Sequence, residues 1–333
     1  MIHPEIFENI NKVVDHLNNQ GWSLSRTYIR NAQYTVMDYG NNNLVYNPQP
    51  LASPLFRGQN EFFEPCIATF YRNRTDEFTQ FIYRLKIEEF GIITSKHPAI
   101  KETIETGIFY DYVAVAQHYE FRTEMLDLTN SLPVAAFFAV TKQDSGKYVP
   151  MGESSKPGVL YFIQPTAQFS HISNDNQPEN HPAGWQVFKR PGEQRAFLVN
   201  LTKNRDFNNM ANIHAFRFSH DKSISEQIYH MFHKGEDLFP KDIFAEKAAR
   251  IKDSTIFSRN AFEKAFENSG ISLTRETILS ELGKRNISIQ ENPNWEYSDE
   301  EIKVLQELSF SGKLIENPSA TTRLIYTPPK KEE

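Results

Sequence analysis

The stretch QHYEFRTEMLDLTNSLPVAAFFA, residues 117–139, says most about the fold of this chain. It opens on three consecutive hydrogen-bonding side chains, Gln117, His118 and Tyr119, and closes on an apolar run. That run predicts a buried helix, capped by one of residues 129–131 and with a proline in its first turn. A helix amino terminus offers free N–H groups and a partial positive charge, so this junction predicts a site for a phosphate or carboxylate.

A second short segment, LFRGQ at residues 55–59, follows an Asn- and Pro-rich stretch and predicts a strand that ends in a turn. Arg57 projects a guanidinium beside Gly58, where no side chain obstructs an anion. Together with the helix junction, Arg57 would complete an anion clamp. The alternative is a structural arginine paired with a buried carboxylate, for which Asp127 is the obvious partner.

His118 is a candidate catalytic residue because polar neighbours flank it, and the alternative is a structural histidine. We expect no metal site, since the other histidines form no convincing set of ligands. His230 and His233 lie three apart on a predicted helix, yet no third ligand suggests itself. The chain also lacks the glycine-rich phosphate loops and the nucleophile elbow pattern.

Apolar periodicity along the chain predicts an α+β fold, an antiparallel sheet core with surrounding helices. The predicted strands of this sheet are residues 158–164, 195–201 and 213–219. The predicted helices are residues 4–20 with Pro4 in the first turn, 75–90 capped by Thr75, 221–233, and 240–252 starting at Pro240.

The sequence pattern of residues 253–333 differs from that of the preceding chain. It predicts a small C-terminal unit of two or three short helices, one with the capping box Ser298-x-x-Glu301. A hairpin-like stretch at 312–326 allows a winged-helix-like unit, and the alternative is a helical appendage. Ten Lys and Arg against thirteen Asp and Glu at 254–333, a net −3, favour the appendage over DNA binding. Residues 1–252 are expected to form a domain that folds without it.

Composition narrows the function classes. The net charge of −6 does not favour nucleic-acid binding, which depends on a basic face. No leader-like start and no long apolar run are visible, so we expect a cytoplasmic protein that does not interact with membranes. The single cysteine, Cys66, suits a reducing compartment, and its apolar neighbours favour a buried residue over a nucleophile.

Four segments together resemble the FRG domain, a family named for its Phe-Arg-Gly motif. They are LFRGQ at 55–59, EPCIATFYR at 64–72, the 117–139 stretch, and KRPGEQRAFLV at 189–199. The likeness follows the family's order and spacing from about residue 5 to residue 252. The chain departs from the family pattern at Glu120 (usually Gly), Glu124 (Arg), Leu128 (Trp), and Glu193 with Arg195 (Gln-Gln-Gly), which suggests a specialised member.

FRG domains in turn resemble, in motif order, the ADP-ribosyltransferase fold. The resemblance implies an NAD-dependent ADP-ribosyltransferase-like enzyme, in a bacterial toxin or phage-defence setting, with an unknown macromolecular target. NAD cleavage passes through an oxocarbenium-like state that needs a carboxylate, an arginine for the pyrophosphate and an aromatic wall for nicotinamide. The alternative is a non-catalytic ligand- or partner-binding module with a buried network of Arg57, His118 and Asp127.

The same resemblance implies residue roles. Arg57 would clamp the NAD phosphate, Gly58 would contact nicotinamide through its backbone, and Glu193 would stabilise the cation and orient the nucleophile. The alternative for Glu193 is a solvated loop carboxylate beside Gly192. His118 completes the catalytic set, and the further NAD contacts implied are Gln59, Gln117, Tyr119, Thr129, Ser131, Phe137 and Gln194.

Overall fold

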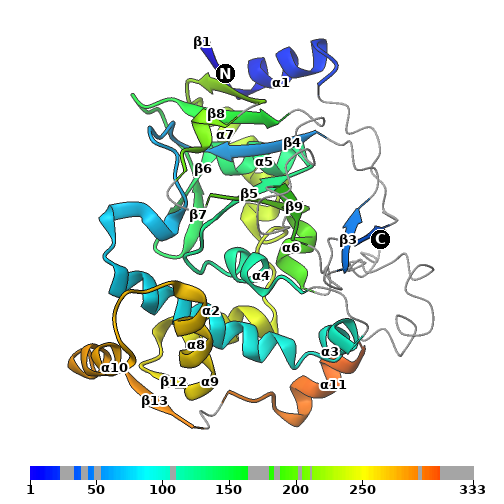
Figure 1. The fold of residues 1–333 in the computed structure, drawn as a ribbon. Helices are drawn as coiled ribbons and strands as arrows, with labels where there is room; N and C mark the ends of the chain where they lie inside the picture. Colours follow the sequence, from blue (N-terminus) through cyan, green and yellow to red (C-terminus); the bar gives the residue numbers. More distant parts are fainter. Residues whose placement is uncertain are drawn as a thin grey trace.

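The computed structural model describes most of the chain (Figure 1). The described residues are 1–22, 34–38, 44–48, 54–105, 110–163, 180–183, 188–201, 205–210, 212–291 and 295–307. None of the helices in these ranges combines the length and apolar composition that a bilayer-spanning helix requires.

Within the described ranges, one seven-stranded sheet forms the centre of the fold, in the order β1-β11-β8-β4-β5-β10-β9. Its strands are β1 (Ile2–Phe7), β4 (Leu55–Gln59), β5 (Met125–Thr129), β8 (Gly158–Ile163), β9 (Asn180–Pro182), β10 (Ala196–Asn200) and β11 (Ile213–Phe218). The α+β class and the predicted strands are confirmed. β1 runs parallel to β11, whereas all the other neighbours are antiparallel.

The sheet is split between β4 and β5. β4 pairs with β8 along its whole length, and β5 pairs with β10 along its whole length. Between β4 and β5, however, Phe56 opposite Thr129 is the one register pair, and the strands diverge beyond it. Arg57–Gln59 and Asp127–Leu128 therefore have no ladder partner across this junction, and the Arg57 guanidinium bonds to the backbone oxygen of Asp127 there.

Apolar side chains alternate between the two faces of the sheet. One face carries Phe56, Phe162 and Phe216, which pack against α1 (Ile10–Asn19) and α5 (Leu132–Val140), with α7 (Lys222–Met231) alongside. The opposite face carries Leu55 and Tyr161 and packs against the segment that contains Cys66. Cys66 is buried, as predicted.

A second layer consists of helices and lies below the sheet in Figure 1. Its members are α2 (Glu77–Ser95), α3 (Pro98–Glu105), α4 (Tyr112–His118), α8 (Ile243–Asp253), α9 (Arg259–Ser269), α10 (Arg275–Lys284) and α11 (Asp299–Glu307). α4 links the layers, since it precedes β5 in the chain while its residues Val115 and Ala116 belong to the helical core.

The C-terminal helices share this apolar core with α2. Phe81 of α2 meets Phe262 of α9 edge to face, with ring centroids 5.7 Å apart. Buried Glu89 of α2 accepts hydrogen bonds from the backbone N (2.6 Å) and Oγ (2.9 Å) of Ser258, the cap of α9. The domain boundary at residue 252 stays a prediction, and this packing gives a physical reason to test it.

The N-terminal segment corrects the predicted helix at 4–20. Residues 2–7 form the edge strand β1, and Asn9 caps a shorter helix through the backbone N of Lys12 at 3.2 Å. Pro4 lies on an edge strand, where its missing N–H need not break a ladder. Ile10, Val13 and Leu17 are buried as expected. The apolar periodicity therefore predicted the helix correctly from Ile10 onward and was wrong only for the residues before it.

Two other helix starts also differ from expectation, because an aspartate caps each helix. Asp76, not Thr75, accepts from the backbone N of Thr79 at 2.6 Å and caps α2. Asp242 accepts from the backbone N of Ala245 at 2.7 Å, so α8 begins after it and not at Pro240.

In the C-terminal part, the capping box is confirmed by reciprocal hydrogen bonds between Ser298 and Glu301 at 2.8 and 3.2 Å. Short strands β12 (Ile256–Ser258) and β13 (Ser288–Gln290) form a parallel pair beside the helices. The hairpin-like stretch 312–326 lies outside the described residues.

Candidate functional site

Two adjoining cavities, of about 330 and 440 Å³, lie at the split in the sheet. The smaller is lined by residues 56–60 from the end of β4 and by Asp127–Thr129 of β5. The larger opens past Asn73, Glu120 and Arg122. The wall common to both consists of Arg72, His118, Asp127, Phe138, Gln143, Tyr148 and Gln194.

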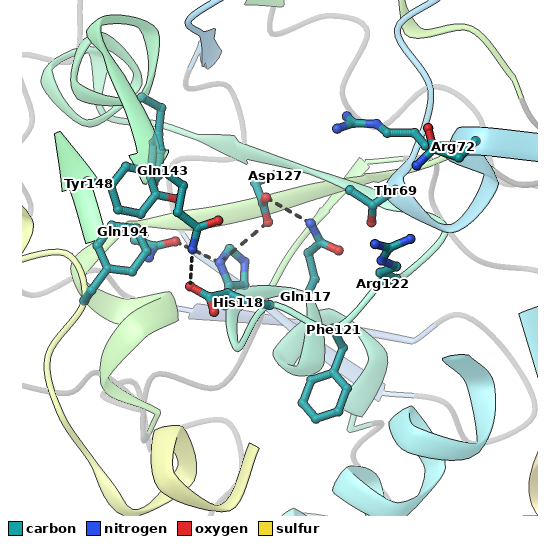
Figure 2. Close-up of a pocket in the computed structure, with 14 residues that line it drawn as sticks. Thr69, Arg72, Gln117, His118, Phe121, Arg122, Asp127, Gln143, Tyr148 and Gln194 are labelled. Carbon is teal, nitrogen blue, oxygen red and sulfur yellow. Dashed lines mark hydrogen bonds and ion pairs between the residues drawn. The ribbon is translucent and has the colours of Figure 1, made fainter. Parts of the chain in front are cut away.

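A chain of hydrogen bonds orients Asp127 on this common wall, and Figure 2 shows its last link, between Gln117 and Asp127. Thr123 donates its hydroxyl proton to Oε1 of Gln117 at 2.5 Å, so the amide nitrogen of Gln117 is free to donate. It donates to Oδ2 of Asp127 at 3.0 Å. Oδ1 of Asp127 has no hydrogen-bond partner among the described residues, so one carboxylate oxygen remains for a ligand.

His118 is held on its other side by Gln194. The Gln194 amide nitrogen donates to the backbone oxygen of Leu238 at 2.9 Å, which points Oε1 at Nδ1 of His118, 3.0 Å away. Because Oε1 can only accept, Nδ1 carries the proton in the neutral imidazole. Nε2 is then an acceptor, and within the described structure it is buried and has no partner.

Three arginines converge on the cavities, and each is anchored by a neutral group. Arg57 donates to the backbone oxygen of Asp127 at 2.7 Å, and Arg72 to that of Ile67 at 3.1 Å. Arg122 donates to the hydroxyl of Tyr83 at 2.7 Å and stacks over its ring. The Arg57–Asp127 pairing is thus real but differs from the expected ion pair, because a strand-edge carbonyl replaces the carboxylate.

An aromatic wall faces the arginines across the cavity. Tyr148 and Phe239 stack with ring centroids 4.5 Å apart, and Phe138 meets both edge to face. Burial, followed by the negative charges of Glu120 and Asp127, raises the pKa of Tyr148, so its hydroxyl stays protonated and able to donate. In Figure 2, Tyr148 lies across the cavity from Arg72 and Arg122, with His118 and Asp127 between them.

The structure brings most of the predicted site residues together. Those that line the cavities are Arg57, Gly58, Gln59, Gln117, His118, Thr129 and Gln194. Tyr119, Ser131, Phe137 and Glu193 are not among the described lining residues.

Tyr119 and Phe137, which the resemblance implies as NAD contacts, are fully buried in the described structure, and that role stays a prediction. The Tyr119 hydroxyl donates to Oδ2 of Asp242 at 2.7 Å, inside the helical core. Phe137 faces the aromatic cluster around Phe232, and the next residue of the same helix, Phe138, turns toward the cavity instead. Adjacent helix positions differ by about 100° in direction, which motif matching alone does not resolve.

Ser131 caps α5 through the backbone N of Val134 at 3.5 Å, which settles the cap among the three candidates. The described lining of the smaller cavity includes Ala135 and Phe138, and no residue of the helix's first three positions. The described lining therefore gives no support to the expected anion clamp at this helix amino terminus, which stays a prediction. The cavity meets the side of α5, where the N–H groups are committed to the helix.

Glu193 ends the short helix α6 (Lys189–Glu193), and the next residue, Gln194, enters the cavity. An amide thus stands where the resemblance places a carboxylate, and Asp127 is the carboxylate at the common wall. The catalytic role of Glu193 stays a prediction.

Gly58 is required by packing. A Cβ at this position would lie 1.8 Å from the backbone oxygen of Ala135 in α5. We expected an absent side chain to admit an anion, whereas the close approach of α5 to β4 is what the glycine permits.

The cavity also uses residues that our sequence analysis did not select for the site. Tyr148 comes from the hairpin of β6 (Thr141–Asp144) and β7 (Lys147–Pro150), which we did not predict, and Phe239 precedes α8. Arg72 ends the EPCIATFYR segment, so its place in the motif was the available signal. Among the described residues no cluster of His, Cys, Asp and Glu could hold a metal ion.

The fold and the site define an α+β protein whose split sheet holds a cationic, aromatic-walled cavity. Residues 52–147 match the family model FRG domain, so the chain contains an FRG domain. No curated protein and no solved structure gave a match. The matched residues include β4, α4, β5 and α5, which supply most of the site, while β8 and β10 complete the sheet from beyond the match.

Proposed function

We propose that this FRG domain is an NAD-dependent ADP-ribosyltransferase-like enzyme whose site is the pair of cavities at the split sheet. The observation that carries the proposal is the meeting of Arg57, His118 and Asp127 where β4 and β5 diverge. A cation for phosphate, a free carboxylate oxygen and an imidazole acceptor are the groups that ribosyl transfer needs.

The reaction breaks the bond between ribose C1′ and the nicotinamide nitrogen, and nicotinamide leaves with the electron pair. A nucleophilic oxygen or nitrogen of the acceptor then bonds to C1′ and loses its proton to a base. In this proposal Oδ1 of Asp127 stabilises the positive charge at the ribose, since it has no described hydrogen-bond partner. Nε2 of His118 accepts the proton of the acceptor.

The remaining lining residues bind the substrate. Arg57 contacts a phosphate, and the ring faces of Phe138 and Tyr148 supply an apolar wall for nicotinamide. The volumes of the two cavities, about 330 and 440 Å³, fall in the range of small-molecule sites. A role as a toxin or phage-defence effector, and location in the cytoplasm, belong to this proposal.

A second candidate is a non-catalytic ligand-binding module. It is favoured by Gln194, because an amide directed at His118 holds the imidazole in place without adding a charge. In that case Arg57, His118 and Asp127 would recognise a ligand and leave it unchanged.

The experiment is nicotinamide release from NAD by the full chain, with lysate proteins and nucleic acids as acceptors, comparing wild type with Asp127→Asn. We expect release by the wild type and a loss of roughly 10²-fold or more in the variant. NAD affinity, measured by calorimetry, should change little. Binding of NAD without release from any acceptor would favour the module, and no binding at all would exclude NAD.

A further inference from the structure

We infer that Arg57, Arg72 and Arg122 form one anion site for a ligand with two adjacent phosphate groups. The inference deepens the proposed function, with which it shares the cavity, by adding two arginines and a diphosphate class of ligand. It does not depend on nicotinamide chemistry.

The three arginines span the two cavities. Arg57 lines the smaller, Arg122 lines the larger, and Arg72 lines both. They come from β4, from the 3-10 segment Thr69–Arg74 and from the loop after α4. A ligand that occupies both cavities would therefore meet Arg57 in the smaller, Arg122 in the larger and Arg72 in both. A single phosphate group in one cavity would engage only some of the three.

Nearby acids balance the charges of the three guanidinium groups only in part. In the described structure none of them forms an ion pair, and their anchors are two backbone oxygens and a tyrosine hydroxyl. Burial, followed by repulsion from Arg57 and Arg122, lowers the pKa of Arg72, while Cys66 and Asp127 act in the opposite direction. Like charges held this close without a ligand are unfavourable, and a bound anion would relieve the repulsion.

The net charge of the residues that line the cavities indicates how many negative charges the bound anion carries. Around both cavities the described lining contains four basic side chains, Arg57, Arg72, Arg122 and Lys142, and two acidic ones, Asp127 and Glu120, a net +2. Glu120 is itself paired with Lys252 at 3.2 Å. A diphosphate group carries at least two negative charges and accepts the paired N–H bonds of several guanidinium groups.

Unpartnered polar atoms at the common wall give independent support for a ligand. The His118 side chain is 1% exposed and lines both cavities, and its Nε2 has no described partner. Nε of Arg57 is likewise buried without a described partner. Buried polar atoms are seldom left unpaired, so a bound group that satisfies them is expected.

The test is calorimetric titration of the full chain with inorganic pyrophosphate and with orthophosphate at fixed ionic strength. We expect pyrophosphate to bind at least ~10-fold more tightly, and Arg72→Gln and Arg122→Gln each to weaken it by about 10-fold. Arg259→Gln, which replaces a partly buried arginine of α9 that pairs with Glu291 and lines neither cavity, is the control and should bind like the wild type. Thermal unfolding confirms that each variant folds, and Arg122 is exposed, so its replacement leaves the core intact.

Equal affinity for the two anions, or wild-type binding by Arg122→Gln, would overturn the inference. ADP and NAD as competitors distinguish a free nucleoside diphosphate from a dinucleotide, and displacement by neither would also overturn it. Pyrophosphate binding without nicotinamide release leaves the diphosphate site standing and rejects the proposed activity. Nicotinamide release without pyrophosphate binding leaves the proposed activity standing and rejects the diphosphate site.

Discussion

Oδ1 of Asp127 lies 3.7 Å from Nδ1 of His118, too far for a hydrogen bond and close enough for an ion pair if the imidazole is protonated. Nδ1 is occupied by Gln194 at 3.0 Å, so Oδ1 of Asp127 is buried without a described hydrogen-bond partner. Asp127, on β5, therefore lines both cavities with a carboxylate, while the role of Glu193 stays a prediction.

This arrangement ranks two carboxylates that the sequence leaves unranked. Asp127→Asn should lower the rate of nicotinamide release by roughly 10²-fold or more, because it removes the charge next to the ribose. Glu193→Gln should leave the rate within about twofold, since Gln194 and not Glu193 lines the cavity. The assay is initial rate at saturating NAD, with NAD affinity measured separately for each variant.

The reverse ranking would restore the role that the family resemblance assigns to Glu193. A lower rate of nicotinamide release in both variants would mean that the two carboxylates act together.

Arg57→Lys should abolish ligand binding in a chain that still folds. Arg57 reaches the carbonyl of Asp127 with one guanidinium nitrogen and keeps others for an anion, whereas lysine offers a single ammonium group. We expect at least ~10-fold weaker pyrophosphate binding by calorimetry with an unchanged thermal midpoint. Lys156→Gln, which removes a surface cation paired with Glu61, is the control. Wild-type affinity in a folded Arg57→Lys protein would remove Arg57 from the site.

The stability of the chain should fall in mild acid because of His97. Burial in the helical core, against the ring of Phe244, lowers the pKa of His97 to about 4 from 6.5. Below pH 6.5, His97 is protonated in the unfolded chain but stays neutral in the folded chain. Stability is therefore lost as the pH falls from 6.5 to about 4. The loss amounts to about 3 kcal/mol at the lower limit.

His97→Asn tests this directly. Nδ1 of His97 accepts from the backbone N of Ala99 at 3.0 Å, and an asparagine oxygen can do the same without titrating. Urea unfolding at several pH values should show a flatter profile for the variant, although it is less stable at pH 7 because the ring contacts are lost. Parallel profiles for the two proteins would show that His97 does not control the acid sensitivity.

Removal of residues 253–333 should destabilise the remaining chain, contrary to the boundary that the sequence suggests. Phe257 and Phe262 are fully buried in the same core as Phe81, and burying each aromatic side chain contributes about 2–3 kcal/mol. The fragment 1–252 would expose that surface and leave Glu89 without its Ser258 partner. Near-ultraviolet circular dichroism and thermal unfolding of the fragment are the measurements. A cooperative transition near that of the full chain would establish residues 1–252 as a domain.

Local sequence located most of the inner strands of the sheet, several of the helices and most of the predicted site residues, whereas β1 and the β6–β7 hairpin were not predicted. Short runs of β-branched and aromatic residues are sufficient to locate β8, β10 and β11, because these strands bury side chains on both faces of the sheet. The segments around Arg57 and His118 were recognisable because their polar residues stand in apolar surroundings that would otherwise exclude them.

What only the tertiary structure decided is how these segments meet. The divergence of β4 from β5 after Phe56 creates the cavity, and the pairing of strands far apart in sequence is invisible to local periodicity. Because of the rotation of α5, Phe138 and not Phe137 lines the cavity. At the end of α6, Gln194 and not Glu193 does so. Neighbouring residues of a helix or strand point in different directions, so a shift of one position exchanges a site residue for one in the core or on the surface. Which of the two neighbours points into the cavity is fixed by packing, which a local sequence pattern does not specify.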